Sequence, residues 1–141
     1  MSQTIIEFKD VRKSFNGLLV HDGINLSIQK GEIMSLLGGS GSGKSVLLKE
    51  LIGLIMPDSG DIFVLGKQIT QMKEQALMQL REHVGMLFQG AALFDSLTVF
   101  ENIAYPLREH LHLTEKEMRE RVAEKLRLVG LSGIEDKMPA E

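Results

Sequence analysis

The sequence has 141 residues, of which 43% are hydrophobic and 25% are charged, a mixture typical of a folded globular domain. Lys and Arg number 16 against 19 Asp and Glu, so the formal net charge is -3 and no basic surface for nucleic acid is expected. The sequence contains no cysteine, which excludes disulfide bonds and thiolate metal sites.

The first part of the chain has the pattern of antiparallel β-structure. Apolar and polar residues alternate with a period of two over residues 5–30. Asn16 and Gly17 interrupt this pattern, and Asn-Gly favours a tight hairpin because both positions accept a positive φ angle. The continuous apolar run at 33–37 is typical of a parallel strand buried on both faces. The sequence therefore predicts a hairpin followed by a central strand.

The middle of the chain alternates helical and strand-like segments. Residues 44–52 carry apolar side chains at helical spacing, and Gly53 can end that helix. Residues 61–65 predict a short strand that returns to the first β-layer, and 72–82 contain mostly good helix formers. A second buried strand is expected at 84–88. Together with the hairpin, this pattern indicates an α/β fold.

The last part of the chain is helical in character. The segments 98–101 and 114–117 both have the pattern of a capping box, in which a hydroxyl and a carboxylate satisfy free amides at a helix start. Gly130 is placed to end the second of these helices. An apolar stripe at helical spacing runs along the same helix, formed by Met118, Val122, Leu126 and Val129.

One segment matches the phosphate-loop pattern G-x-x-x-x-G-K-[ST], with the residues Gly38, Gly39, Ser40, Gly41, Ser42, Gly43, Lys44 and Ser45. Glycines allow successive backbone amides to surround phosphate oxygens, and the helix that follows adds the positive end of its dipole. Lys44 is expected to neutralise the β- and γ-phosphates, and the Ser45 hydroxyl to ligate Mg²⁺.

Two further residues are candidates for the same site. Gln89 follows the strand expected at 84–88, and ligands of open α/β sheets lie outside the carboxyl ends of the strands. Its amide could ligate Mg²⁺ and orient water, although a glutamine after a strand is more commonly a solvated loop residue. Phe15 could stack on adenine or, equally well on pattern alone, pack in the core of the β-layer.

The β-layer, the loop GGSGSGKS, the segment PDSGDI and Gln89 together resemble the nucleotide-binding domain of ABC transporters. The resemblance covers essentially the whole chain. Residues 85–107 are similar to the ATPase of bacterial Mla-type phospholipid transport systems, which work with MCE proteins. The resemblance implies a P-loop NTPase fold with an incomplete RecA-like core, an amino-terminal antiparallel β subdomain and a truncated helical subdomain.

The resemblance also implies the division of the chain. It implies one nucleotide-binding domain over 1–141, with a β subdomain at about 1–31 and 60–70, a P-loop core at about 32–59 and 71–90, and an incomplete helical subdomain at about 91–141.

The same resemblance implies functional roles. Residues 38–45 correspond to the Walker A loop, Gln89 to the Q-loop glutamine, and Phe15 to an aromatic residue that stacks on adenine and is usually Tyr. Val46 is counted with the nucleotide-binding residues. The cofactors implied are ATP and Mg²⁺, with Lys44 and Gln89 in catalytic roles.

The implied assembly pairs two copies of the ATPase on an integral membrane permease at the inner face of the cytoplasmic membrane. The permease is expected to contact residues 91–107, and an MCE-type protein to belong to the complex. The family pattern continues into an LSGG-type signature, a Walker B strand and a switch histidine, which this sequence does not contain. We therefore expect an amino-terminal part of such an ATPase, which binds ATP without turning it over.

Two alternatives remain from the residues themselves. A small P-loop kinase would use the same loop, but such kinases commonly begin almost at the loop, whereas here a β-layer precedes it. A non-enzymatic nucleotide-binding fragment is the second alternative.

Overall fold

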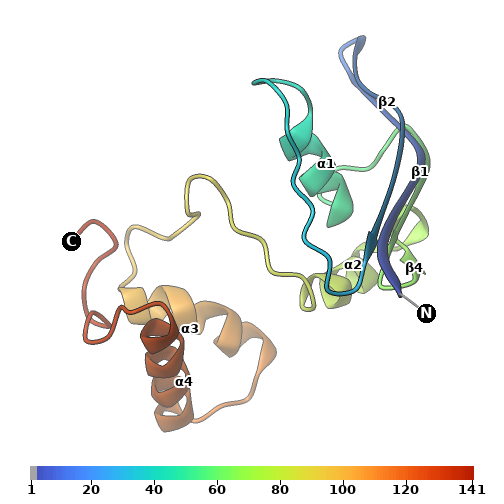
Figure 1. Cartoon of the computed structure of the whole chain (residues 1–141). Coiled ribbons are helices and arrows are strands. Elements are labelled where there is room, and N and C mark those ends of the chain that lie inside the picture. The colour runs from blue at the N-terminus through green and yellow to red at the C-terminus, as the bar shows by residue number, and fades with distance from the viewer. Residues whose placement is uncertain (1–2) are drawn as a thin grey trace. The chain divides into compact units, whose positions relative to one another are not determined.

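The computed structural model describes residues 3–141. The chain divides into two compact units, the first ending at Met86 and the second running from Leu87 to Glu141 (Figure 1). Among the helices of residues 3–141, none combines the length and the apolar character that crossing a bilayer requires.

The first unit contains one antiparallel sheet with the strand order β2-β1-β3-β4. Its strands are β1 (Thr4–Phe15), β2 (Leu18–Gln29), β3 (Ser59–Val64) and β4 (Lys67–Gln68). The hairpin predicted at Asn16 and Gly17 is confirmed, because both residues have positive φ angles and the strands pair directly on either side. The short returning strand predicted at 61–65 is also confirmed, as β3 pairs with β1.

The turn before β3 is fastened to β1 by Asp58. Its carboxylate accepts hydrogen bonds from the Lys13 ammonium and from the Ser14 backbone N–H, each at 2.7 Å. These two bonds hold the pKa of Asp58 below its usual value. Gly60, with φ +87°, lies so close to β1 that a Cβ there would be 2.4 Å from the Asp10 carbonyl oxygen. Glycine is therefore required at this crossing.

Two α-helices pack with the sheet, α1 (Lys44–Leu51) and α2 (Glu74–Arg81), and a short 3-10 turn, η1 (Ile69–Gln71), precedes α2. Arg81, the last residue of α2, links the two helices: its guanidinium donates to the carbonyls of Ile52 and Gly53, which directly follow α1. The shared core consists of Phe8, Val11, Leu47, Ile62, Val64, Ile69, Leu77 and Leu80. The apolar side chains on one face of the sheet thus pack against one face of each helix.

The two buried parallel strands predicted at 33–37 and 84–88 do not form in the described part of the chain. Ile33 and Leu37 are 94% and 93% exposed, and Leu87 is 91% exposed. A strand is held by hydrogen bonds to its neighbours, and neither segment is paired with a strand among residues 3–141. The prediction was wrong because an apolar run indicates a tendency to be buried but does not supply the partner.

The second unit is built from α3 (Val99–His110) and α4 (Glu115–Leu128). Both predicted capping boxes are confirmed, with complete reciprocal hydrogen bonds at Thr98 and Thr114. The core lies between the two helices and consists of Phe100, Ala104, Met118, Val122 and Leu126. Val129 was wrongly placed on this stripe: α4 ends at Leu128, and Val129 is 67% exposed.

Candidate functional site

The segment 38–45 forms a closed loop held together by the side chain of Lys44. The Lys44 ammonium donates to the carbonyl oxygens of Gly38 and Gly39 at 2.8 and 2.7 Å. It also lies 3.2 Å from the Ser42 hydroxyl oxygen. A single ammonium therefore joins the beginning of the loop to the first residue of α1 and places a positive charge inside the loop.

The amino-terminal end of α1 is left open by the protein. Gly43 is the N-cap residue, no side chain caps the helix, and the first turn contains no acidic residue. Within residues 3–141, the backbone N–H groups of Lys44, Ser45 and Val46 have no acceptor. They border a hollow of about 190 Å³ that is lined by Val20 and residues 41–46. Free amides, the positive end of the helix dipole and one ammonium give this hollow the chemistry that an anion requires.

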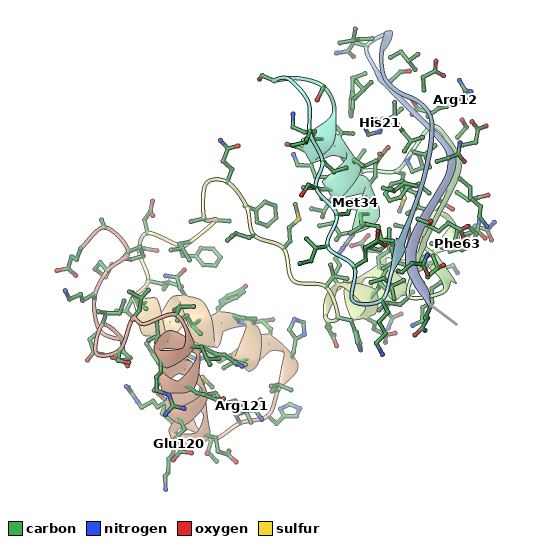
Figure 2. All side chains as sticks on the ribbon, viewed as in Figure 1. Arg12, His21, Met34, Phe63, Glu120 and Arg121 are labelled. Atoms are coloured by element: carbon green, nitrogen blue, oxygen red, sulfur yellow. The ribbon has the colours of Figure 1, made fainter. Side chains whose placement is uncertain are left out.

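A buried ionisable pair forms the floor beneath the loop: His21 on β2, which Figure 2 labels, and Glu50 on α1. His21 Nδ1 lies 2.8 Å from Glu50 Oε2, and His21 Nε2 lies 3.2 Å from the carbonyl oxygen of Gly43. Gly43 has φ +89°, and a Cβ there would come within 2.8 Å of both Val20 and His21. Glycine at this position thus allows α1 to begin directly against the hairpin.

Burial raises the pKa of the Glu50 carboxyl, and the neighbouring His21 opposes this shift. Sequence reasoning missed Val20, His21 and Glu50, because their contacts to the loop and to one another span more than twenty residues. One signal was available: Glu50 lies three residues after Leu47, on the face of the helix that was expected to be apolar.

Phe15 lies at the end of β1 and is 40% exposed. The Lys13 ammonium is 5.3 Å from the centre of its ring, a cation–π distance. Phe15 belongs to neither buried cluster, so the alternative in which it packs the core of the β-layer is not what the structure shows. It is in the same unit as the loop but does not line the hollow at residues 41–46.

Gln89 belongs to the second unit, where it lies in an exposed turn. Two alanines follow shortly after it, and Ala91 and Ala92 have φ angles of 60° and 54°. This left-handed conformation costs alanine roughly 1 kcal/mol per residue. The structure thus gathers residues 38–46 of the expected site into one feature, with Phe15 in the same unit and Gln89 in the other.

The segment 91–107, expected to meet a permease, has buried and exposed members. Phe100 and Ala104 are buried between α3 and α4, so their role is structural. Phe94 and Tyr105 are about half exposed, and their ring centres are 5.3 Å apart. The exposed part of the segment is thus an aromatic pair next to the exposed Leu93.

Comparisons with known proteins agree on one family. The family model described as ABC transporter matches residues 21–141. A probable ribonucleotide transport ATP-binding protein, mkl, of Mycobacterium leprae is 46% identical over 136 residues, which are 96% of this chain and 39% of that protein. The intermembrane phospholipid transport system ATP-binding protein MlaF of Haemophilus influenzae is 40% identical over 141 residues, which are 100% of this chain and 53% of that protein. The chain thus spans about half the length of the curated relatives it matches, or less.

Solved structures show the same fold. A dimeric ATP-binding cassette in a post-hydrolysis state, bound to ADP and Pi, matches with a TM-score of 0.89 and 27% identity over 96% of this chain and 62% of that one. The protein cbiO1 from Clostridium perfringens, described as part of the ABC transporter complex cbiONQ, matches with a TM-score of 0.81 and 31% identity over 96% of this chain and 54% of that one. The expected α/β fold of a P-loop NTPase with an antiparallel β subdomain is confirmed. The phosphate loop, the fold and the family model agree: this chain belongs to the ABC transporter family.

Proposed function

We propose that this chain binds Mg-ATP through residues 38–46 as the ATP-binding subunit of an ABC transporter. The observation that carries the proposal is the open amino-terminal end of α1, where three free amides and the Lys44 ammonium surround one hollow. Every polar group that faces it from residues 44–46 is a donor or a hydroxyl, which fits phosphate oxygens and a magnesium ion. The family match argues against the small P-loop kinase.

Each residue of the proposed site has a distinct role. Lys44, which donates to two loop carbonyls, can turn its ammonium toward phosphate oxygens, which then replace those carbonyls as its acceptors. Ser45 offers a hydroxyl and Gln89 an amide oxygen as Mg²⁺ ligands, and Gln89 orients the attacking water. Phe15 offers its exposed ring to adenine. Bound Mg-ATP supplies the γ-phosphoryl group that the whole protein transfers to water.

We infer that the whole protein couples ATP binding and hydrolysis to the transport of phospholipid or a related solute. The similarity of residues 85–107 to Mla-type ATPases supports this cargo, as does the relative named for intermembrane phospholipid transport. Other relatives are named for ribonucleotide transport and methionine import. Because the named solutes differ among relatives, the phospholipid cargo is part of the proposal.

The proposed partners are a second copy of the subunit, an integral membrane permease and an MCE-type protein, at the inner face of the cytoplasmic membrane. The dimeric cassettes among the similar structures support the second copy. For the permease, the exposed pair of Phe94 and Tyr105 is the feature of residues 91–107 that a partner helix can cover. The proposed division into a β subdomain, a P-loop core and a helical subdomain is supported by the strands of residues 3–141, which lie in 4–29 and 59–68.

Binding of Mg-ATP by calorimetry tests the central part of this proposal. Lys44→Ala removes the ammonium that lies inside the loop, and a hydrogen bond to a charged group contributes up to about 3 kcal/mol, so affinity should fall by roughly 150-fold. Lys49→Ala is the matched control, because it removes the same charge from an exposed position of α1. Equal affinity of the wild-type protein and Lys44→Ala would show that the loop is not the phosphate site.

A further inference from the structure

The proposed function assigns no role to His21 and Glu50, the buried pair beneath the phosphate loop. His21 is 4% exposed and Glu50 is fully buried, in a unit whose other buried side chains are apolar. One oxygen of the Glu50 carboxylate, Oε1, is buried without a hydrogen-bond partner in the described structure. Ionisable groups are costly to bury, and a hydrophobic pair of similar volume is commonly as stable or more stable. Stability of the fold therefore does not explain this pair.

The geometry fixes one of the two protons of the pair. A backbone carbonyl can only accept, so His21 Nε2, 3.2 Å from the Gly43 oxygen, must carry a hydrogen. The 2.8 Å contact between His21 Nδ1 and Glu50 Oε2 then holds one further proton, on either the ring or the carboxyl. In both arrangements the pair is neutral overall, and Nε2 remains a donor to the loop.

The Gly43 carbonyl controls the direction of the next amide. It accepts from His21 Nε2 on the floor and from the Leu47 N–H inside α1, at 2.9 Å. A trans peptide unit is planar, so the Lys44 N–H points opposite to the Gly43 C=O. Holding the carbonyl against the floor therefore aims the Lys44 N–H away from the floor and into the hollow. This amide is one of the three free donors at the site.

We propose that His21 and Glu50 are positioning residues of the phosphate loop, in which Glu50 orients the His21 ring and His21 holds the Gly43 carbonyl so that the Lys44 amide faces phosphate. The inference rests on the proposed binding of ATP. It predicts that the pair affects the affinity for the phosphate groups and does not affect the binding of adenine. The pair acts through the loop backbone and does not contact the nucleotide.

The test replaces both members together by His21→Leu/Glu50→Leu, which leaves no unpaired buried charge. Mg-ATP and inorganic tripolyphosphate are titrated calorimetrically into the wild-type protein and the double variant, and thermal unfolding is followed in parallel. We expect both ligands to lose affinity by the same factor, about fivefold for one misdirected donor, while the melting temperature stays unchanged or rises. Val11→Ala is the matched core control, since it should lower the melting temperature of the same unit and leave both affinities unchanged.

The outcomes separate the inference from the function on which it rests. Unchanged affinity in the double variant, with wild-type binding that Lys44→Ala weakens as expected, would overturn the inference alone. Failure of the wild-type protein to bind either ligand would overturn both. A loss of affinity in Val11→Ala equal to that in the double variant would also overturn the inference, because any damage to the core would then have the same effect.

A second measurement does not depend on the folding of a variant. Nitrogen-15 NMR of the His21 ring in the wild-type protein reports which nitrogen carries hydrogen. A protonated Nε2 at every pH at which the protein is folded supports the inference, and a bare Nε2 overturns it.

Discussion

The amino-terminal ends of α1 and α3 differ in whether their first backbone N–H groups have acceptors within the chain. Each helix start has backbone N–H groups without an intrahelical partner. In α3, the first three are satisfied inside the chain: Val99 and Phe100 donate to the carbonyls of Lys137 and Glu135, and Glu101 donates to the Thr98 hydroxyl. In α1, the corresponding amides of residues 44–46 have no acceptor within residues 3–141, and no carboxylate stands nearby on the first turn.

The difference separates helix starts that the chain satisfies by itself from one that is open to a ligand. The α4 start resembles that of α3, since Thr114 and Glu117 form a second complete capping box. Capping boxes stabilise a helix from within, whereas an uncapped start next to a lysine remains available to an external anion. Exchanging features between α1 and these two helices tests this contrast.

Among these exchanges, the largest effect is expected from giving α1 the carboxylate that α3 and α4 carry. Val46 occupies the third helical position of α1, which Glu101 occupies in α3. Val46→Glu should satisfy the helix start with a negative charge and lower the affinity for Mg-ATP by about 2 kcal/mol, roughly 30-fold. Calorimetric titration measures this loss. Val46→Gln is the control of equal size without charge. Equal affinities of the two variants for ATP would contradict the expected effect of the negative charge.

Removing the caps of the other two helices should have a smaller effect, and on stability only. Thr98→Ala and Thr114→Ala each delete a hydroxyl that accepts from a first-turn amide. The free energy of unfolding should fall by about 1 kcal/mol in each variant, measured by urea denaturation, because an N-cap contributes about this much. The affinity for Mg-ATP should stay at the wild-type value. A loss of ATP binding in either variant would show that these helix starts are not purely structural.

The smallest effect concerns acidification of the two capping boxes. Hydrogen bonds from Thr98 and Thr114 hold the pKa values of Glu101 and Glu117 below the usual 4.5. Because the folded-state pKa is the lower one, the stabilisation is complete above the usual value and is lost as the pH falls through the lowered one. The stability difference between the wild-type protein and Glu101→Gln should therefore shrink steadily below about pH 4.5. A difference that is independent of pH in that range would contradict the role of the carboxylate.

Features that lie within a few consecutive residues were predictable from the sequence. The hairpin at Asn16 and Gly17 and both capping boxes each depend on residues fewer than ten positions apart. Local hydrogen-bonding chemistry and backbone preference decide such features, so a short pattern contains the necessary information.

Features that depend on distant partners were not predictable. The contact of His21 with Glu50 joins residues 29 positions apart, and no local pattern connects the two residues. The strand predicted at 33–37 was wrong for a related reason. A strand requires a neighbouring strand, and the apolar run does not specify one. The fold class was thus accessible from the sequence, whereas the floor of the site required the structure.

The most direct test of the contrast between helix starts follows backbone amide signals by NMR during titration with Mg-ATP. The account predicts that the amides of Lys44, Ser45 and Val46 shift strongly, because they change from free donors to donors bonded to phosphate. The amides of Glu101 and Glu117, already bonded to Thr98 and Thr114, should not respond. Shifts at Glu101 or Glu117 with none at residues 44–46 would contradict the claim that the open start of α1 is the phosphate site.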